Sequence, residues 1–386
     1  MIEKLYQIAQ KKERKIIGLM SGTSLDGLDI ALCKFSGSGL QTKVDLLAFD
    51  TIPYSEQIRS EIKKVFAKKN TDLEQVTLLH NYLGKYFADL VLQFLAKNQY
   101  TGQEIDLIAS HGQTIFHAPK HLHQNLLFGN ATLQIADADQ IAYRTGIVTL
   151  SDFRQKHIAA GGEGAPLAIY GDFLLFKKEG ENRILLNIGG ISNFTYIPAS
   201  CNPQEVWATD TGTGNTLLDF FTQKFFQKPY DENGKIAQSG TCNNFLLQKL
   251  LANPFFQLPF PKSTGQETFN FTWVERILQE YHLPISPQDL LCTLTHFTAK
   301  GILKGLQNIQ EQNLTIYVSG GGAKNQFLIS LLQEYYAVLP FENLGISADA
   351  KEAVLFALLA NETITGSKIA IGQNPCVCMG KISLPY

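Results

Sequence analysis

Apolar residues in this chain occur in two patterns. Short unbroken apolar runs are typical of buried strands, whereas an apolar residue at every third or fourth position is typical of a helix with one buried face. The first pattern predicts strands at 15–20, 27–34, 46–52, 107–109, 147–150, 183–188, 192–197 and 315–318. The second pattern predicts helices at 72–98, 134–144, 215–226, 245–251, 289–307 and 351–360.

Strands followed by helices occur twice along the chain, which predicts an α/β protein. We expect an N-terminal lobe over 1–150, completed by the C-terminal segment 361–386, and a C-terminal lobe over 151–360. Each half contains a strand pair that closes over a polar turn with glycine, at 21–26 and at 189–190. Two such lobes joined by a short hinge are expected to hold a ligand cleft between them.

Composition narrows the classes of function. The 386 residues include 33 Lys and Arg and 35 Asp and Glu, so the formal net charge is −2. Such a charge gives no electrostatic attraction to a nucleic acid or an anionic membrane. The first fifteen residues are charged and contain no apolar signal segment, and nothing further along reaches the roughly 18 apolar residues of a spanning helix. The sequence therefore predicts a cytoplasmic globular protein without a nucleic-acid or membrane partner.

Four polar, glycine-rich segments each follow a predicted strand: 22–27, 187–193, 210–215 and 319–325. Small residues let backbone N–H groups approach an anion closely, hydroxyls add donors, and a nearby carboxylate can hold a hydrated Mg²⁺. A hairpin turn uses the same residue types, so the first segment alone fits either interpretation. The sequence has no Gly-Lys-Ser/Thr phosphate loop, no Gly-x-Gly-x-x-Gly after a strand and no Gly-x-Ser-x-Gly nucleophile turn. Together the four segments predict a bound nucleotide, with its phosphates held by two hairpin turns that face each other across a cleft.

These segments and several others stand in the order expected of a known family. The chain resembles the anhydro-N-acetylmuramic acid kinase family, an unusual branch of the sugar kinase, Hsp70 and actin superfamily, along nearly its whole length. The resemblance rests on the segments 22–29, 110–114, 152–154, 161–167, 187–190, 210–215, 261–265 and 319–322.

The resemblance implies a fold, a reaction and an assembly. The fold is the two-lobed sugar kinase, Hsp70 and actin fold, which is ribonuclease H-like, with a cleft for ATP and substrate between the lobes. The reaction is the conversion of 1,6-anhydro-N-acetylmuramic acid to N-acetylmuramic acid 6-phosphate, with ATP and Mg²⁺ as cofactors and water consumed, in peptidoglycan recycling. The assembly is a homodimer.

The resemblance also assigns roles to residues. Asp210 is the catalytic base that deprotonates water at the anomeric carbon, and Glu352 is a second catalytic carboxylate of the cleft. The nucleotide is assigned to Gly22, Thr23, Ser24, Leu25, Asp26, Gly27, Leu28, Asp29, Gly189, Gly190, Gly320, Gly321 and Gly322. The sugar is assigned to Ser110, His111, Gly112, Gln113, Thr114, Arg154, Gly212 and Asn215. Asp26 is also the candidate Mg²⁺ ligand.

The charged residues of this set have ordinary structural interpretations as well. Asp210 would suit a turn or the N-cap of a helix that starts near residue 215. Glu352 would suit the positive end of its helix dipole, and Arg154 would suit a structural salt bridge as well as the lactyl carboxylate of the sugar.

The chain departs from the resemblance at a few positions. Met20 and Asn187 stand where sugar kinases generally have Asp, so direct metal ligands are missing there. His157 stands where the family often has an acidic residue, and Glu163 stands where a Gln is usual. Both exchanges would be compatible with a smaller anhydrosugar such as levoglucosan. The alternatives are therefore a levoglucosan kinase or, outside the enzymes, an actin- or Hsp70-like clamp in which ATP hydrolysis only times a conformational change.

Overall fold

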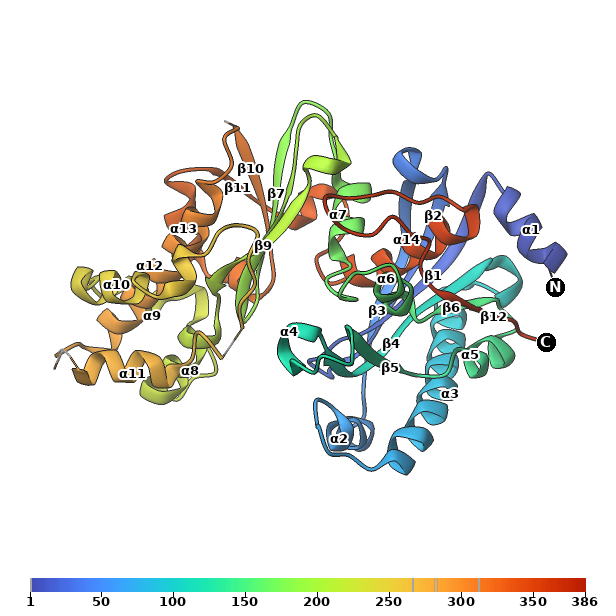
Figure 1. Cartoon of the computed structure of the whole chain (residues 1–386), viewed down its shortest axis with the longest axis horizontal. Coiled ribbons are helices and arrows are strands. Elements are labelled where there is room, and N and C mark those ends of the chain that lie inside the picture. The colour runs from blue at the N-terminus through green and yellow to red at the C-terminus, as the bar shows by residue number, and fades with distance from the viewer. Residues whose placement is uncertain (1, 266, 281, 283, 312) are drawn as a thin grey trace. The chain divides into compact units, whose positions relative to one another are not determined.

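A computed structural model describes residues 2–265, 267–280, 282, 284–311 and 313–386. The chain folds as two compact α/β units, which confirms the expected fold class (Figure 1). The first unit comprises Met1–Phe176 and Asp349–Tyr386, and the second comprises Lys177–Ala348. These boundaries differ from the expected 150 and 360, because helix α7 (Ala168–Phe176) packs against helix α14 (Lys351–Thr365), and α14 packs against the sheet of the first unit.

A seven-stranded sheet forms the first unit, in the order β12-β6-β4-β1-β2-β3, with β5 paired to β4. The predicted first hairpin is confirmed, because β1 and β2 are antiparallel and Met20 pairs with Asp29 across the turn. β4 runs parallel to β1 and to β6. The strands are β1 (Glu13–Ser21), β2 (Gly27–Ser36), β3 (Lys43–Pro53), β4 (Leu107–Ala118), β5 (Ala131–Ile135), β6 (Thr149–Ser151) and β12 (Lys381–Ser383).

Helices of the first unit pack on this sheet and on one another. The predicted long helix is α3, whose first turn is capped by Asp72, and it packs against α5. α14 packs against β1, β2 and β4, and it approaches β1 so closely that a Cβ added to Gly18 would lie 1.8 Å from the Ala353 carbonyl oxygen. The helices are α1 (Ile2–Gln10), α2 (Glu56–Val65), α3 (Leu73–Lys97), α4 (Lys120–His123), α5 (Ala138–Thr145), α6 (Phe153–Ala159), α7 (Ala168–Phe176) and α14 (Lys351–Thr365), with 3-10 turns at Gly39–Gln41 and Gly102–Glu104.

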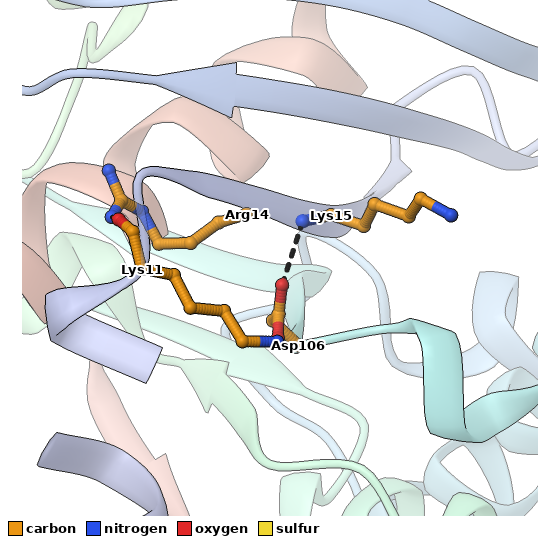
Figure 2. A network of polar contacts seen from close by, with 4 residues as sticks. All are labelled: Lys11, Arg14, Lys15 and Asp106. Carbon is orange, nitrogen blue, oxygen red and sulfur yellow. Dashed lines mark hydrogen bonds and ion pairs between the residues drawn. The ribbon is translucent and has the colours of Figure 1, made fainter. Parts of the chain in front are cut away.

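Charged residues fasten the start of β1 (Figure 2). Asp106, which is buried just before β4, accepts the backbone N–H of Lys15 at 2.9 Å and pairs with the Lys11 ammonium at 2.5 Å. Arg14 donates to the Lys11 carbonyl, and its Nε donates to Oδ1 of Asn361 in α14 at 2.7 Å. Buried polar groups that satisfy one another in this way fix a single arrangement, here of β1 against the far end of α14.

A five-stranded sheet forms the second unit, in the order β11-β10-β7-β8-β9. The second predicted hairpin, β7 with β8, is also confirmed, and α12 packs against β8 and β9. The strands are β7 (Asn182–Ile188), β8 (Ile191–Ile197), β9 (Trp207–Thr213), β10 (Leu314–Ser319) and β11 (Ala337–Pro340). The helices are α8 (Thr216–Phe226), α9 (Lys235–Gln238), α10 (Asn244–Leu251), α11 (Phe271–Glu280), α12 (Pro287–Leu306) and α13 (Gln326–Gln333), with 3-10 turns at Pro203–Glu205, Glu232–Gly234, Pro254–Gln257, Gly321–Lys324 and Phe341–Leu344. Within the described residues, no helix has the length and apolar character needed to cross a membrane.

Three local expectations were wrong. The segment 210–213 lies in β9 rather than in a turn, and 110–114 lies within β4, which is longer than its apolar core 107–109. The buried positions of both segments are partly polar, so the apolar pattern did not reveal these strands. The helix expected over 134–144 begins only at Ala138, because Asp137 caps it by accepting the N–H of Asp139 at 3.0 Å.

Candidate active site

The turn between β1 and β2 has a fixed backbone shape. Leu25 adopts the left-handed region (φ 59°), and its side chain is buried in the core of the first unit. The Leu25 carbonyl accepts a hydrogen bond from Nε of Arg59 at 3.2 Å. Thr23 and Ser24 are exposed, so the turn is anchored through Leu25 while its hydroxyls remain open to a ligand.

A buried polar chain holds the first residue of this turn. The Tyr54 hydroxyl donates to Oγ of Ser21 at 2.7 Å, and Ser21 Oγ donates to Oε1 of Gln113. Nε2 of Gln113 then donates to the Gly22 carbonyl at 3.4 Å. Burial raises the pKa of Tyr54, so its hydroxyl keeps its proton and remains a donor. The amide of Gln113, which was predicted to contact the sugar, is thus engaged in shaping the turn.

Three carboxylates lie near one another beside the turn. Burial raises the pKa of Asp29, the hydrogen bond from Thr51 at 2.6 Å opposes this rise, and the charges of Asp349 and Asp26 add to it. A divalent cation would relieve this repulsion, and Mg²⁺ is usually held by one or two carboxylates together with waters and phosphates. The described residues contain no group of three His, Cys, Asp or Glu side chains arranged to hold a metal by themselves.

Arg154, in α6, is held by two hydrogen bonds within the first unit. Its Nε donates to Nε2 of His111 at 3.0 Å, and its Nη1 donates to the Gly164 carbonyl at 2.8 Å. Burial, followed by the charge of Arg154, lowers the pKa of His111 to about 3, so the imidazole is neutral and Nε2 can accept. Nη2 takes part in neither of these two bonds, and a guanidinium is a group that can bind a carboxylate.

Glu352 occupies the first turn of α14, as predicted from the sequence. Glu352 is exposed to solvent. Desolvation by the surrounding protein nevertheless raises the pKa of its carboxyl, and the positive charges of Lys351 and Arg154 oppose this rise. The carboxylate is therefore reachable by solvent and close enough to Arg154 to feel its charge. A raised pKa at a reachable carboxylate is a feature of catalytic sites as well as of structural ion pairs.

A pocket of about 460 Å³ opens in the first unit. His111 and Gly112, both predicted to contact sugar, line it together with Asp152 and Lys381. Ser110 is fully buried, and its Oγ accepts the N–H of Gly112 at 3.2 Å, so it supports this wall from within.

In the second unit, three glycine-rich segments meet at one end of the sheet. The N–H of Asn215 donates to the Gly189 carbonyl at 2.8 Å, and its Nδ2 donates to the Ile188 carbonyl at 3.3 Å. An added Cβ would lie 2.7 Å from the Ile188 carbonyl oxygen at Gly320, where φ is 82°, and 2.2 Å from Cγ2 of Ile188 at Gly322. Only glycine fits at these two positions, and the close approach brings the three segments into one surface.

β9 positions Asp210 in the same unit. The backbone N–H of Asp210 donates to the Lys262 carbonyl at 2.9 Å, and its Oδ2 accepts the N–H of Thr264 at 2.7 Å. Burial raises the pKa of Asp210, the Thr264 N–H opposes this rise, and the negative charge of Glu267 adds to it. No cation in the described part of the chain contributes to that shift. A half-buried carboxylate with a raised pKa, and with Oδ1 outside the Thr264 bond, has the properties of a general base.

Asp210 does not cap helix α8, because α8 begins at Thr216 with Asn215 as its N-cap and Asp210 lies in the preceding strand. Comparison with known proteins decides the family: a family model described as anhydro-N-acetylmuramic acid kinase matches residues 14–374. The chain belongs to the anhydro-N-acetylmuramic acid kinase family. The resemblance drawn from its motifs is thereby confirmed.

Two curated relatives with the name anhydro-N-acetylmuramic acid kinase illustrate the extent of the match. The protein from Pseudoalteromonas translucida (strain TAC 125) is 48% identical over 394 residues, which cover 99% of this chain and 98% of the relative. The protein from Caldanaerobacter subterraneus subsp. tengcongensis is 38% identical over 396 residues, which cover 99% of this chain and 100% of the relative. Among solved structures, the activator of the 2-hydroxyisocaproyl-CoA dehydratase from Clostridium difficile with bound ADPNP is similar at 11% identity and a TM-score of 0.42, covering 91% of this chain and 96% of that chain.

The predicted site residues of this anhydro-N-acetylmuramic acid kinase family member are divided between the two units. The first unit holds residues 22–29, residues 110–114, Arg154 and Glu352. The second unit holds Gly189, Gly190, Asp210, Gly212, Asn215 and residues 320–322. Arg154 and Glu352 were expected in the C-terminal lobe and lie instead in the first unit, since α6 and α14 pack there.

Sequence reasoning gave no role to Tyr54, Ser21 or Lys262, although each lies beside a predicted site residue. Ser21 ends an apolar run directly before Gly22, which is a weak signal for a polar contact inside the sheet. Lys262 follows a segment with three phenylalanines, and its burial could not be deduced from the sequence because lysine is ordinarily exposed.

Proposed function

We propose that this protein is an ATP-dependent kinase that hydrolyses and phosphorylates 1,6-anhydro-N-acetylmuramic acid, giving N-acetylmuramic acid 6-phosphate in peptidoglycan recycling. Family membership supports the reaction class. The observation that carries the proposal is the state of Asp210: half-buried on β9, with a raised pKa, no ion-pair partner among the described residues and one carboxylate oxygen outside its bond to Thr264.

The proposed reaction needs a base for a water molecule. Water adds to the anomeric carbon while the bond between that carbon and the bridging oxygen O6 breaks, and Asp210 accepts the proton that the water loses. O6 forms a bond to the γ-phosphorus of ATP, and ADP leaves. Asp210 then returns its proton to solvent, so the step balances with water and ATP as the only co-reactants.

Each unit has a backbone surface that suits a phosphate. The turn 22–29 offers N–H groups and the hydroxyls of Thr23 and Ser24 to the phosphates, and the surface formed by 189–190 and 320–322 offers the close backbone approach that a nucleoside phosphate needs. Asp26 and Asp29 would hold Mg²⁺, which neutralises charge on the phosphates when it is bound.

The sugar would meet Arg154, Glu352 and the wall at His111. The guanidinium of Arg154 suits the lactyl carboxylate that distinguishes N-acetylmuramic acid from simpler sugars. His157 is buried and its Nδ1 accepts the N–H of Gly164 at 3.0 Å, while Glu163 is exposed and lies 3.3 Å from Nδ1 of His121. Both departures from the family pattern thus have partners within the first unit, and neither gives specific support to levoglucosan as the substrate.

Release of ADP tests the proposal when the two anhydrosugars are compared side by side. We expect ADP release to depend on 1,6-anhydro-N-acetylmuramic acid and to be at least about tenfold slower with levoglucosan, because levoglucosan has no carboxylate for Arg154. In H₂¹⁸O the label should enter the sugar at the anomeric carbon and not the phosphate. ADP release that is independent of any anhydrosugar would contradict the proposal and favour an ATP-gated clamp.

A homodimer belongs to the same proposal, on the basis of family resemblance. Sedimentation velocity at micromolar concentration tests it. A single species with the mass of one 42.9 kDa chain would contradict it.

A further inference from the structure

Lys262 is a buried lysine directly beside the strand that carries Asp210. Only 8% of the residue is exposed, and its ammonium donates to the Phe255 carbonyl at 2.9 Å and to the Leu258 carbonyl at 3.3 Å. Lysine is almost never buried to this extent unless its charge is compensated. In the described part of the chain no carboxylate forms an ion pair with Lys262, so the compensation comes from other groups.

Aromatic rings supply that compensation. The ammonium lies 4.0 Å from the ring centroid of Phe260, 4.4 Å from that of Phe255 and 5.9 Å from that of Phe256. Rings at these distances attract a cation through their negative faces. Burial, and then the charge of Lys304, lowers the pKa of Lys262. The two carbonyls and three rings together, which we call the Lys262 cage, fold the segment 255–262 around one charge.

The same segment is joined to the strand of Asp210 by its backbone. The Lys262 N–H donates to Oγ1 of Thr209 at 3.0 Å, and the Lys262 carbonyl accepts both from that hydroxyl at 3.1 Å and from the Asp210 N–H at 2.9 Å. Two residues later, the Thr264 N–H donates to the carboxylate of Asp210 at 2.7 Å. The position of the Asp210 carboxylate therefore depends on where the cage places residues 262–264.

We propose that Lys262 is a positioning residue for Asp210: its ammonium, held by three phenylalanine rings and two carbonyls, fixes the loop whose backbone orients the catalytic carboxylate. This inference rests on the proposed function, because it assumes that Asp210 is the base. Lys262 touches neither reactant and acts only through the loop. Its role goes beyond family membership, which identifies the motif at 261–265 but gives Lys262 no task.

The variant Lys262→Met tests this role, since methionine keeps the length of the side chain and removes the charge. We expect kcat for sugar-dependent ADP release to fall by about 10²-fold, the loss associated with displacement of a catalytic group by about 1 Å. The KM for ATP should stay within about twofold, because the nucleotide-binding segments do not include this loop. Loosening the Thr264 bond also removes the interaction that lowers the pKa of Asp210, so the acid limb of the kcat profile should move to higher pH.

Lys304→Met is the matched control. Lys304 also lies over an aromatic ring of the cage, 5.4 Å from the centroid of Phe256, but its ammonium makes no bond to the carbonyls of the loop among the described residues. We expect its kcat and acid limb to match those of the parent protein. Phe260→Leu is a second test if Lys262→Met does not fold, because Phe260 is only half-buried and its replacement is easier to accommodate. Loss of this ring should lower kcat and move the acid limb in the same directions, by smaller amounts.

The outcomes separate the inference from the proposed function. The positioning role would be overturned if Lys262→Met and Phe260→Leu had the same kcat as Lys304→Met. It would also be overturned if the acid limb of the kcat profile stayed in place while thermal stability fell, because Lys262 would then have only a structural role. Asp210→Asn, measured beside them, tests the function independently. If Asp210→Asn is inactive while Lys262→Met behaves as the parent, only the inference fails; if Asp210→Asn remains active, the proposed function fails first.

Discussion

Gly18 permits the close contact between β1 and the helix that carries Glu352. A Cβ added at this position would lie 1.8 Å from the carbonyl oxygen of Ala353, the residue after Glu352, and 3.1 Å from the backbone N of Ala357. Carbon and oxygen atoms that are not bonded cannot approach so closely, and neither partner is a flexible side chain. Gly18→Ala therefore forces α14 to move away from β1 by more than about 1 Å, since ordinary contact lies near about 3.5 Å.

The size of the effect follows from this displacement. Inserting a methyl group into a packed interior costs about 1–3 kcal/mol, and a clash with backbone belongs at the upper end of that range, about 3 kcal/mol. For a unit of about 200 residues this corresponds to a melting temperature lower by about 6–12 °C. Because Glu352 moves with the helix, kcat for sugar-dependent ADP release should also fall, by about 10²-fold for a shift of this size.

Thermal unfolding and steady-state ADP release measure the two effects of Gly18→Ala. Gly129→Ala is the control in the same unit, since no heavy atom lies within 4 Å of its added Cβ, and it should match the parent in both assays. A melting temperature within about 2 °C of the parent would refute the close packing of β1 on α14. A normal kcat despite a lowered melting temperature would refute the role given to Glu352.

Two further predictions concern the phosphates and the base. Gly22→Ala should leave the melting temperature unchanged, because only Oγ of Ser24 lies within 4 Å of the added Cβ, at 3.8 Å. It should raise the KM for ATP about tenfold, because the backbone at Gly22 is expected to approach a phosphate closely. An unchanged KM for ATP would contradict the phosphate role of the turn. Glu267→Gln removes a negative charge that raises the pKa of Asp210, so the pKa of the base should fall and the acid limb of kcat should move to lower pH. Since the base is active when ionised, activity on the acid side of the optimum should increase; a limb that stays in place or moves to higher pH would show that Asp210 does not set it.

The sequence predicted the parts of the fold that depend on local patterns. The β1–β2 and β7–β8 hairpins and the long helix α3 follow from apolar periodicity and glycine turns, and the structure has all three. It did not predict β9, because its inward positions are the threonines 209, 211 and 213, whose hydroxyls hide the strand from a hydrophobicity pattern. The boundaries of the two units also differ from expectation, since they depend on which sheet α14 covers, a contact between distant parts of the chain.

The candidate site was recognised as a set of motifs, but the contacts within it were not. The order of the motifs identified Asp210 and the turn 22–29, because family resemblance is carried by local segments. The bond from Thr264 to Asp210, the neutral His111 that accepts from Arg154, and the Lys262 cage depend on side chains brought together by folding, and no local pattern specifies them.

The rate of ADP release by Asp210→Asn with saturating ATP and 1,6-anhydro-N-acetylmuramic acid is the most direct test of the central claim, that one carboxylate on β9 deprotonates the attacking water. Asparagine keeps the oxygen that accepts the Thr264 N–H and cannot accept the proton. The account predicts a kcat lower by about 10²–10⁴-fold, with the KM for ATP and the melting temperature close to those of the parent. A kcat within about threefold of the parent would contradict it.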